Sequence, residues 1–287
     1  MEKRRFTWFM LLPSAIVFLA LGVYPTIVAL WTSLTSYSLT DPVSRKFVFL
    51  GNYLKLLTDT RFWTSLGHSL WFVGVSVFVS FVLGLGIELL LYRTKKFQGF
   101  FRIVFLVPMV IAPTITTLNF KFMYNYNLGI INRLLQVVGI PKVDFLGNPS
   151  VALWSAIAVD VWQWTPLVIL VLLSGLEALP KEPIEAALID GASGWEIFRY
   201  ITMPLLNRFV AVVVVIRTMD ALKVYETIQL MTAGGPGTAS ETMNTYLATV
   251  GFSWFDMGYA SALGIFALYF TSILALLIVK RTKAFSS

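Results

Sequence analysis

The side chains best suited to polar chemistry lie inside long apolar runs. Asp160, Trp162, Gln163 and Trp164 interrupt the apolar run from about residue 151 to 173. A carboxylate at the centre of a bilayer costs roughly 2.5–3.5 kcal/mol on insertion scales, so we expect Asp160 to face a bundle interior or a wet cavity. No nucleophile lies beside it in the sequence. The chemistry expected here is therefore hydrogen bonding and aromatic contact, not catalysis.

Catalytic and metal-binding groups are scarce in the rest of the chain. It has no cysteine, which excludes disulfides, thiolate catalysis and cysteine-ligated metals. Its single histidine, His68, leaves no cluster for a metal site and is interpreted as a residue at the outer edge of a span. No G-x-x-x-x-G-K-[ST] motif occurs, so the usual phosphate-binding loop for ATP is missing. The sequence predicts no catalytic residue and no metal ligand.

Further charges lie in two other apolar runs. Arg217, Asp220 and Lys223 recur every third residue in the run from about 207 to 230. Residues three positions apart share a helix face, so Asp220 can pair with both basic residues. A structural ion ladder is favoured here over contact with a ligand. Glu88, close to the end of the run from about 68 to 92, is predicted to extend to the membrane face, with a polar contact inside the bundle as the alternative.

A polar segment from Glu185 to Leu206 separates two of the apolar runs. Its first part is rich in strong helix formers, and Gly191 supplies the backbone freedom for a turn. Ser193 and Glu196 have the spacing of a capping box for a second helix, and Pro204 marks the start of the next element. We predict a helix-turn-helix at the membrane face. Its simplest role would be to lie on the lipid headgroups.

The composition indicates whether these elements fold in water or in a membrane. Of 287 residues, 57% are hydrophobic and 13% charged, and the mean hydropathy is +0.77. Soluble domains contain about 45–50% apolar and 25% charged residues. The chain is therefore expected to be an integral membrane protein. Its net charge of +7 arises largely from clusters beside apolar runs, as membrane orientation requires, and no nucleic-acid-binding motif occurs.

Six apolar runs are long enough to span a bilayer. They cover about residues 9–34, 68–92, 103–123, 151–173, 207–230 and 259–279. A cleaved signal peptide is the alternative for the first run, but it is longer than a signal sequence and no cleavage site follows it. Pro13 and Pro25 are expected to bend the first span, and Pro108 and Pro113 to interrupt the third.

Basic clusters predict the orientation of these spans. They comprise Lys3 to Arg5, Arg93 to Lys96 with Arg102, and Lys280 to Lys283. Because such clusters stay in the cytoplasm, both termini are predicted to be cytoplasmic. The segments 35–66 and 124–149 are then outer loops, the first with a short helix near residues 52–57. Six aromatic residues of the first loop are assigned to the headgroup level: Tyr37, Phe47, Phe49, Tyr53, Phe62 and Trp63.

The polar segment resembles a known motif. Glu185-Ala186-Ala187, Asp190-Gly191-Ala192 and Ile201-x-Met203-Pro204 resemble the cytoplasmic EAA loop of ABC importer membrane subunits, with Met203 in place of leucine as the only departure. The resemblance implies a type I permease fold, all-α with six transmembrane helices, in which residues 180–206 form a coupling helix that docks on an ATPase subunit. The permease core would cover residues 66–282, and residues 1–65 the tail, the first span and an outer loop. The coupling residues would be Glu185, Ala186, Ala187, Asp190, Gly191, Ala192, Ile201 and Pro204.

A second motif narrows the resemblance. Thr232-Ala233-Gly234-Gly235-Pro236, following the Arg217 pattern, resembles the carbohydrate branch of these permeases, in particular the first permease subunit of maltose and glycerol-3-phosphate importers. This resemblance implies a sugar as the substrate. Aromatic rings would stack on the sugar, and polar groups would replace its hydration. The residues expected along that pathway are Asn119, Asp160, Trp162, Gln163, Trp164 and Tyr225.

The resemblance also implies partners and a location. They are a second homologous permease, two ATPase subunits that bind ATP and Mg²⁺, an extracytoplasmic sugar-binding protein, and the lipid of a prokaryotic cell membrane. This chain would bind no cofactor and no nucleic acid, and would not be an enzyme. The alternative is a secondary transporter or channel driven by an ion gradient. That alternative accounts for spans with buried charges but leaves the EAA motif without a purpose.

Overall fold

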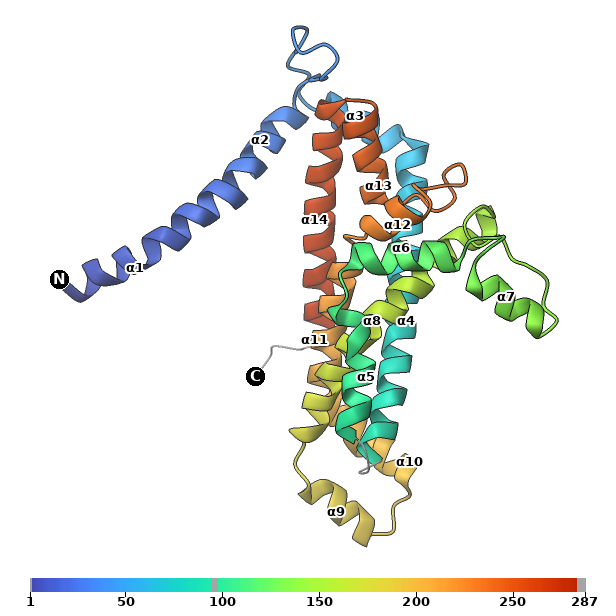
Figure 1. Cartoon of the computed structure of the whole chain (residues 1–287). Helices are drawn as coiled ribbons and strands as arrows, with labels where there is room; N and C mark the ends of the chain where they lie inside the picture. Colours follow the sequence, from blue (N-terminus) through green and yellow to red (C-terminus); the bar gives the residue numbers. More distant parts are fainter. Residues whose placement is uncertain (1, 94–97, 283–287) are drawn as a thin grey trace. The chain divides into compact units, whose positions relative to one another are not determined.

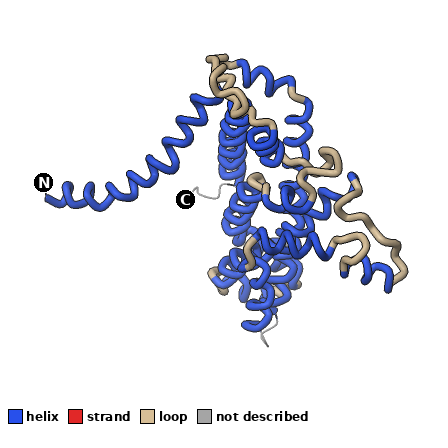
Figure 2. Tube along the Cα trace, turned by 45° about the horizontal axis from the view of Figure 1, so that its top comes forward, coloured by secondary structure: helices blue, strands red, loops and turns tan. Residues whose placement is uncertain are grey.

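The chain folds almost entirely into helices. The computed structural model describes residues 2–93 and 98–282, so Lys95, Lys96 and Lys283 of the predicted basic clusters lie outside the described residues. Within the described part there is no strand, and only two isolated bridges, Thr35 to Phe47 and Ser38 to Asp256, lie in its loops (Figure 2). Five helices are long and apolar enough to cross a membrane, and a bent pair makes a possible sixth span. The predicted all-α membrane fold is confirmed.

Two compact units make up the chain. Unit 1 contains residues 1–63 and 246–270, and unit 2 contains residues 64–245 and 271–287. The predicted division at residue 65 stays a prediction, because these units combine separate stretches of the chain. The helices of unit 1 are α1 (Glu2–Phe18), the π-helical turn η1 (Leu19–Val23), α2 (Tyr24–Ser33), α3 (Gly51–Thr58), the end of α13 (Met243–Ala248), the π-helical turn η3 (Thr249–Ser253) and the first part of α14 (Met257–Thr282).

The first apolar run forms a span as predicted. Residues Phe9–Ser33 are helical throughout and long enough to cross a bilayer. Pro13 lies inside α1, whereas Pro25 lies in the first turn of α2, directly after η1. Because the helix is continuous through η1, Pro25, which has no N–H, cannot donate a hydrogen bond to the preceding turn. The π-helical turn therefore marks the place where the two halves of the span join.

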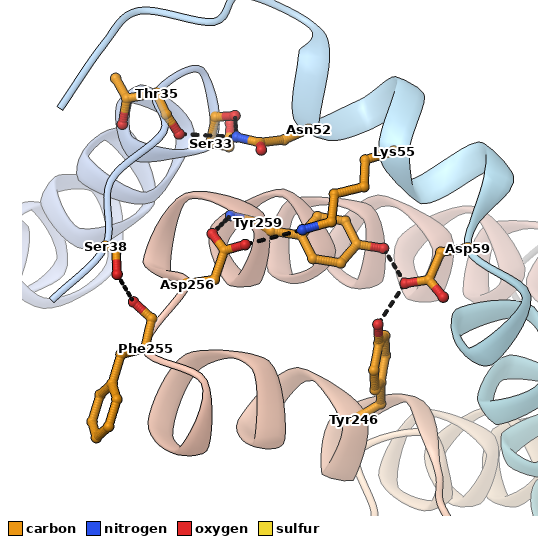
Figure 3. A network of polar contacts seen from close by, with 10 residues as sticks. All are labelled: Ser33, Thr35, Ser38, Asn52, Lys55, Asp59, Tyr246, Phe255, Asp256 and Tyr259. Carbon is orange, nitrogen blue, oxygen red and sulfur yellow. Dashed lines mark hydrogen bonds and ion pairs between the residues drawn. The ribbon is translucent and has the colours of Figure 1, made fainter. Parts of the chain in front are cut away.

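Asp59 holds the interior of unit 1 together (Figure 3). Its Oδ1 accepts the backbone N–H groups of Arg61 and Phe62 at 3.0 and 3.1 Å and so caps the start of α4 (Thr60–Arg93). Its Oδ2 accepts the hydroxyls of Tyr246 and Tyr259, each at 2.5 Å. Partial burial raises the pKa of Asp59, but the two hydroxyls and the backbone N–H groups outweigh it, and the pKa lies below its ordinary value of 3.8.

We expect Asp59→Asn to destabilise the chain by about 1–3 kcal/mol, because an amide nitrogen cannot accept the two tyrosine hydroxyls. The thermal unfolding midpoint of the purified chain in detergent measures this loss. Because the pKa of Asp59 is lowered on folding, its contribution is present above pH 3.8 and is lost as the pH falls further. The difference between parent and variant should therefore narrow in acid. Tyr246→Phe removes only one of the two hydroxyls that donate to Asp59, so it should lower the stability of the chain less than Asp59→Asn does.

Unit 2 is built around α8 (Pro149–Glu177), which packs against α5 (Gln98–Val110) and α11 (Met203–Ala221) (Figure 1). Its core includes Val168 and Leu172 of α8 and Val213 of α11. A Cβ at Gly175 would lie 2.7 Å from the Phe209 ring, so α8 and α11 approach closely there. The other helices are α6 (Pro113–Met123), α7 (Ile130–Val137), α9 (Glu182–Ile189), α10 (Gly194–Ile197), the π-helical turn η2 (Phe198–Thr202) and α12 (Glu226–Met231).

Three predicted spans differ from the structure in extent. Capped by Asp59, α4 begins at Thr60, earlier than the predicted start near His68. The third span is two helices, α5 and α6, bent by 92° between Val110 and Pro113, and not one interrupted helix. The fifth ends at Ala221, and α12 is a separate element. The helix α7 inside the second outer loop was not predicted.

Two side chains lie elsewhere than predicted. Phe62 is completely buried, with its ring 5.1 Å from that of Phe266, so it is a core residue and not part of a headgroup belt. Glu88 is also completely buried, and its carboxylate has no hydrogen-bond partner among the residues that the structure describes. The prediction that Glu88 extends to the membrane face is therefore wrong, because its place on α4 faces the bundle.

Candidate functional site

The polar segment forms the predicted helix-turn-helix, which we call the elbow (residues 180–206). Its first helix, α9, ends where Gly191 adopts a φ of +79°. A residue with a Cβ is disfavoured in this left-handed region. Ser193 then starts α10 with both hydrogen bonds of a capping box, since its backbone N–H donates to Glu196 Oε2 at 2.7 Å. Pro204 lies in the first turn of α11. The sequence signals of the elbow thus act where they were expected.

The elbow presents apolar side chains to its surroundings. Ile189 is 87% exposed, and Leu188, Trp195 and Tyr200 are also exposed. So are Glu185 and Ala186, whereas Ala187 is half-buried. Gathered apolar exposure of this kind marks a surface that another molecule covers. The second and third pieces of the EAA motif lie together, because Asp190, Gly191 and Ala192 line one hollow with Tyr200 and Ile201.

A second hollow lies between α6 and α8. This cavity of about 490 Å³, which we call the α6/α8 cavity, is lined by Ile111, Thr116, Asn119, Phe120, Phe122, Met123 and Trp162. The Trp162 ring meets that of Phe120 edge to face, with centroids 5.2 Å apart, and is 41% exposed. Thr116 is buried, and its hydroxyl has no partner among the described residues. An aromatic face beside the exposed amide of Asn119 suits a neutral, hydroxyl-rich ligand.

The six predicted pathway residues divide between three places. Asn119 and Trp162 line the α6/α8 cavity, and Gln163 supports it, since its Nε2 donates to the Ile111 carbonyl at 3.0 Å at the break between α5 and α6. Tyr225 is outside the cavity lining, at the start of α12. The other two, Asp160 and Trp164, face Arg217. Their assignment to a substrate pathway stays a prediction.

Arg217 is the centre of a buried polar network in unit 2. Its Nη2 donates to Asp160 Oδ2 at 2.5 Å and to Ser76 Oγ at 3.1 Å. Its Nη1 donates to Asp220 Oδ2 at 2.9 Å, and its guanidinium lies 5.6 Å from the centre of the Trp164 ring. The predicted Arg217–Asp220 pair is therefore present. Lys223 follows the end of α11, is exposed, and forms no ion pair among the described residues, so the upper half of the predicted ladder is absent.

The motif from Thr232 to Pro236 closes on itself. Thr232 Oγ1 lies 2.7 Å from Ser240 Oγ, and Ser240 Oγ donates to the Gly235 carbonyl at 2.6 Å. Gly234 has a φ of +85° and lies against Glu241. With Pro236, these residues form a compact turn. Among the described residues of unit 2, none of the motif lines the α6/α8 cavity.

Sequence reasoning missed three functional candidates. Thr116 and Phe120 line the cavity, and Thr116 precedes Asn119 by three residues, which places both on one face of a short helix. That signal was present but was hidden by treating residues 103–123 as one helix. The Asp160–Arg217 pair joins residues 57 positions apart. No local pattern predicts such a pair.

Comparison with known proteins identifies the class. Residues 76–283 match the family described as binding-protein-dependent transport system inner membrane component. The chain belongs to this family. The resemblance drawn from the EAA motif is thereby confirmed.

Individual relatives match along nearly the whole chain. The chain is 37% identical to the trehalose/maltose transport system permease protein MalF of Thermococcus litoralis, over 97% of this chain and 93% of that protein. It is 30% identical to the trehalose transport system permease protein SugA of Mycobacterium tuberculosis, over 98% and 89%. It is also 30% identical to the sulfoquinovosyl glycerol transport system permease protein SmoG of Agrobacterium fabrum, over 96% and 90%.

Solved structures agree on the fold. A chain of a bacterial ABC transporter involved in the import of the acidic polysaccharide alginate has a TM-score of 0.86 and 21% identity, with 100% of this chain and 98% of that chain covered. A methionine ABC transporter, MetNI in inward-facing conformations, is more distant, with a TM-score of 0.58, 16% identity, and 82% and 98% covered. The predicted type I importer permease fold is confirmed.

Proposed function

We propose that this chain is a permease subunit of an ATP-driven importer, through which a sugar passes from an extracytoplasmic binding protein to the cytoplasm. The elbow carries the proposal. It combines the EAA motif, a rigid turn at Gly191 and exposed apolar side chains on Leu188, Ile189 and Trp195. A membrane subunit that moves solute with energy from a separate ATPase needs a protruding surface of this kind for that ATPase to hold.

The substrate proposal rests on the relatives and on the α6/α8 cavity. Relatives named for trehalose, maltose and sulfoquinovosyl glycerol share about a third of their residues with this chain. The cavity offers Trp162 and Phe120 as aromatic surfaces and Asn119 as a hydrogen-bonding group, and none of its described lining residues is charged. A neutral oligosaccharide or sugar derivative suits this lining better than an acidic one. Asp160, Gln163, Trp164 and Tyr225 would act around this site.

The assembly would contain a second, homologous permease, two ATPase subunits and an extracytoplasmic sugar-binding protein. ATP and Mg²⁺ would bind to the ATPase subunits, and this chain would hold no cofactor and catalyse no reaction. The basic clusters that end at Arg5, Lys96 and Lys283 support an orientation with both termini in the cytoplasm of a prokaryotic cell. In that orientation the elbow is cytoplasmic and the Thr232-to-Pro236 turn is extracytoplasmic.

Reconstitution tests the proposal against an ion-driven transporter. The chain is co-purified with its partner permease and ATPase subunits, placed in proteoliposomes, and supplied with the binding protein and labelled trehalose or maltose. We expect uptake that requires ATP and the binding protein and persists when ionophores collapse the ion gradients. Uptake that ionophores abolish and ATP does not affect would contradict the proposal.

A further inference from the structure

The side chain of Arg217 connects three helices of unit 2. It belongs to α11, Asp160 to α8 and Ser76 to α4, and Ser76 Oγ also donates to Asp160 Oδ2. The Arg217 side chain is 1% exposed and that of Asp160 is 6% exposed. Asp220, on the same helix as Arg217, is 42% exposed. The Arg217–Asp160 contact, which joins two helices, is therefore buried, whereas the Arg217–Asp220 contact within α11 is partly exposed.

Stability alone does not account for a charge pair at this place. Burying two charges requires both to lose water, and well-packed apolar residues of similar volume often hold a core as well or better. The same helices already pack through Val168, Leu172 and Val213. What a buried pair adds is geometry, because its hydrogen bonds form in one arrangement of the helices only.

The pair joins the helix that continues from the elbow to the helix that borders the α6/α8 cavity. Within the elbow, η2 leads directly into α11, which carries Arg217 about four helical turns after its first residue, Met203. On α8, Asp160 precedes Trp162 by two residues and Gln163 by three. A shift of α11 that preserves the ion pair must therefore move the part of α8 that borders the cavity.

We infer that Arg217 and Asp160 are a positioning pair, which transmits movement of the elbow along α11 to the Trp162 and Gln163 side of the cavity. This inference rests on the proposed function. Neither residue needs to contact the sugar, since the pair sets the relative position of two helices. Losing the pair should separate ATP hydrolysis from transport without dispersing the subunits.

The test removes both charges together. Asp160→Leu combined with Arg217→Met removes both buried charges of the pair, and Asp220, which loses its contact with Arg217, is 42% exposed, so the complex should still assemble. In proteoliposomes with the binding protein, we expect ATP hydrolysis within about twofold of the parent but at least tenfold less sugar carried per ATP. Asp220→Asn is the matched control, because it removes a contact of Arg217 on its own helix and keeps the interhelical pair. It should carry sugar per ATP within about twofold of the parent.

Each other outcome would overturn the inference. A double variant that carries as much sugar per ATP as the parent would show that the pair transmits nothing. A double variant that fails to assemble would make the pair a stability element. Equal loss in Asp220→Asn would show that the interhelical contact has no special role. Failure of the proposed function itself is distinguishable, because the parental complex would then take up no sugar with ATP.

Discussion

Replacing Gly191 with valine is expected to lower ATP-driven sugar uptake at least tenfold while the chain still inserts into the membrane. Gly191 has a φ of +79°, and a left-handed residue with a Cβ costs about 1–2 kcal/mol, most for a β-branched side chain. This free-energy cost arises from the backbone conformation of the turn and not from a steric clash, since a Cβ at Gly191 would meet nothing within 4 Å. A cost of about 1.4 kcal/mol changes a population tenfold. The rate of sugar uptake measures the loss of transport, and the abundance of the chain in the membrane fraction measures its insertion.

Gly191→Asn is the matched control for this prediction. Asparagine adopts left-handed backbone angles far more readily than valine does, although it adds comparable bulk. We therefore expect Gly191→Asn to retain most of the uptake. Equal loss in both variants would mean that bulk at the docking surface matters, and not the turn. Unchanged uptake in Gly191→Val would remove the coupling role from the elbow.

Replacing Trp162 with alanine is expected to lower uptake at subsaturating sugar about tenfold or more, with the ATPase subunits still bound. Trp162 contributes the largest side chain to the α6/α8 cavity and packs edge to face on Phe120. Apolar contact in a binding pocket is worth about 1–3 kcal/mol, or 10–200-fold in specificity. Initial uptake rates across a range of sugar concentrations, with co-purification of the ATPase, measure the effect.

Trp154→Ala provides the comparison on the same helix. Trp154 is 48% exposed and forms an edge-to-face pair with Trp71, with ring centroids 5.7 Å apart. It is not part of the α6/α8 cavity lining. Its loss should leave sugar uptake within about twofold of the parent. If both variants lose uptake equally, Trp162 is a packing residue; if Trp162→Ala releases the ATPase, its role is structural.

The elbow could be predicted in detail because its signals are local. The turn at Gly191, the Ser193–Glu196 capping box and the helix start at Pro204 each depend on residues a few positions apart. Capping and turn chemistry act over that distance, and so does the EAA motif. Hydropathy likewise located the spans, because the bilayer sets their length.

Features that depend on tertiary contact could not be predicted in this way. Beyond the 92° bend between α5 and α6, α6 packs against α12, where Lys121 Nζ donates to the Leu230 carbonyl at 2.6 Å. Burial of Phe62 depends on Phe266, which is distant in sequence. The sequence showed that Asp160 and Arg217 needed partners in the membrane, and only the fold shows that they partner each other.

The most direct test of the account uses the absence of cysteine from the chain. Single cysteines at Ala186 and Ala187 are each paired with cysteines placed across the candidate docking face of the ATPase subunit, in the assembled complex in membranes. We expect crosslinks to the ATPase that change in yield when ATP binds, and labelling of both positions from the cytoplasmic side only. Labelling from outside the cell, or contact with lipid alone in the assembled complex, would contradict it.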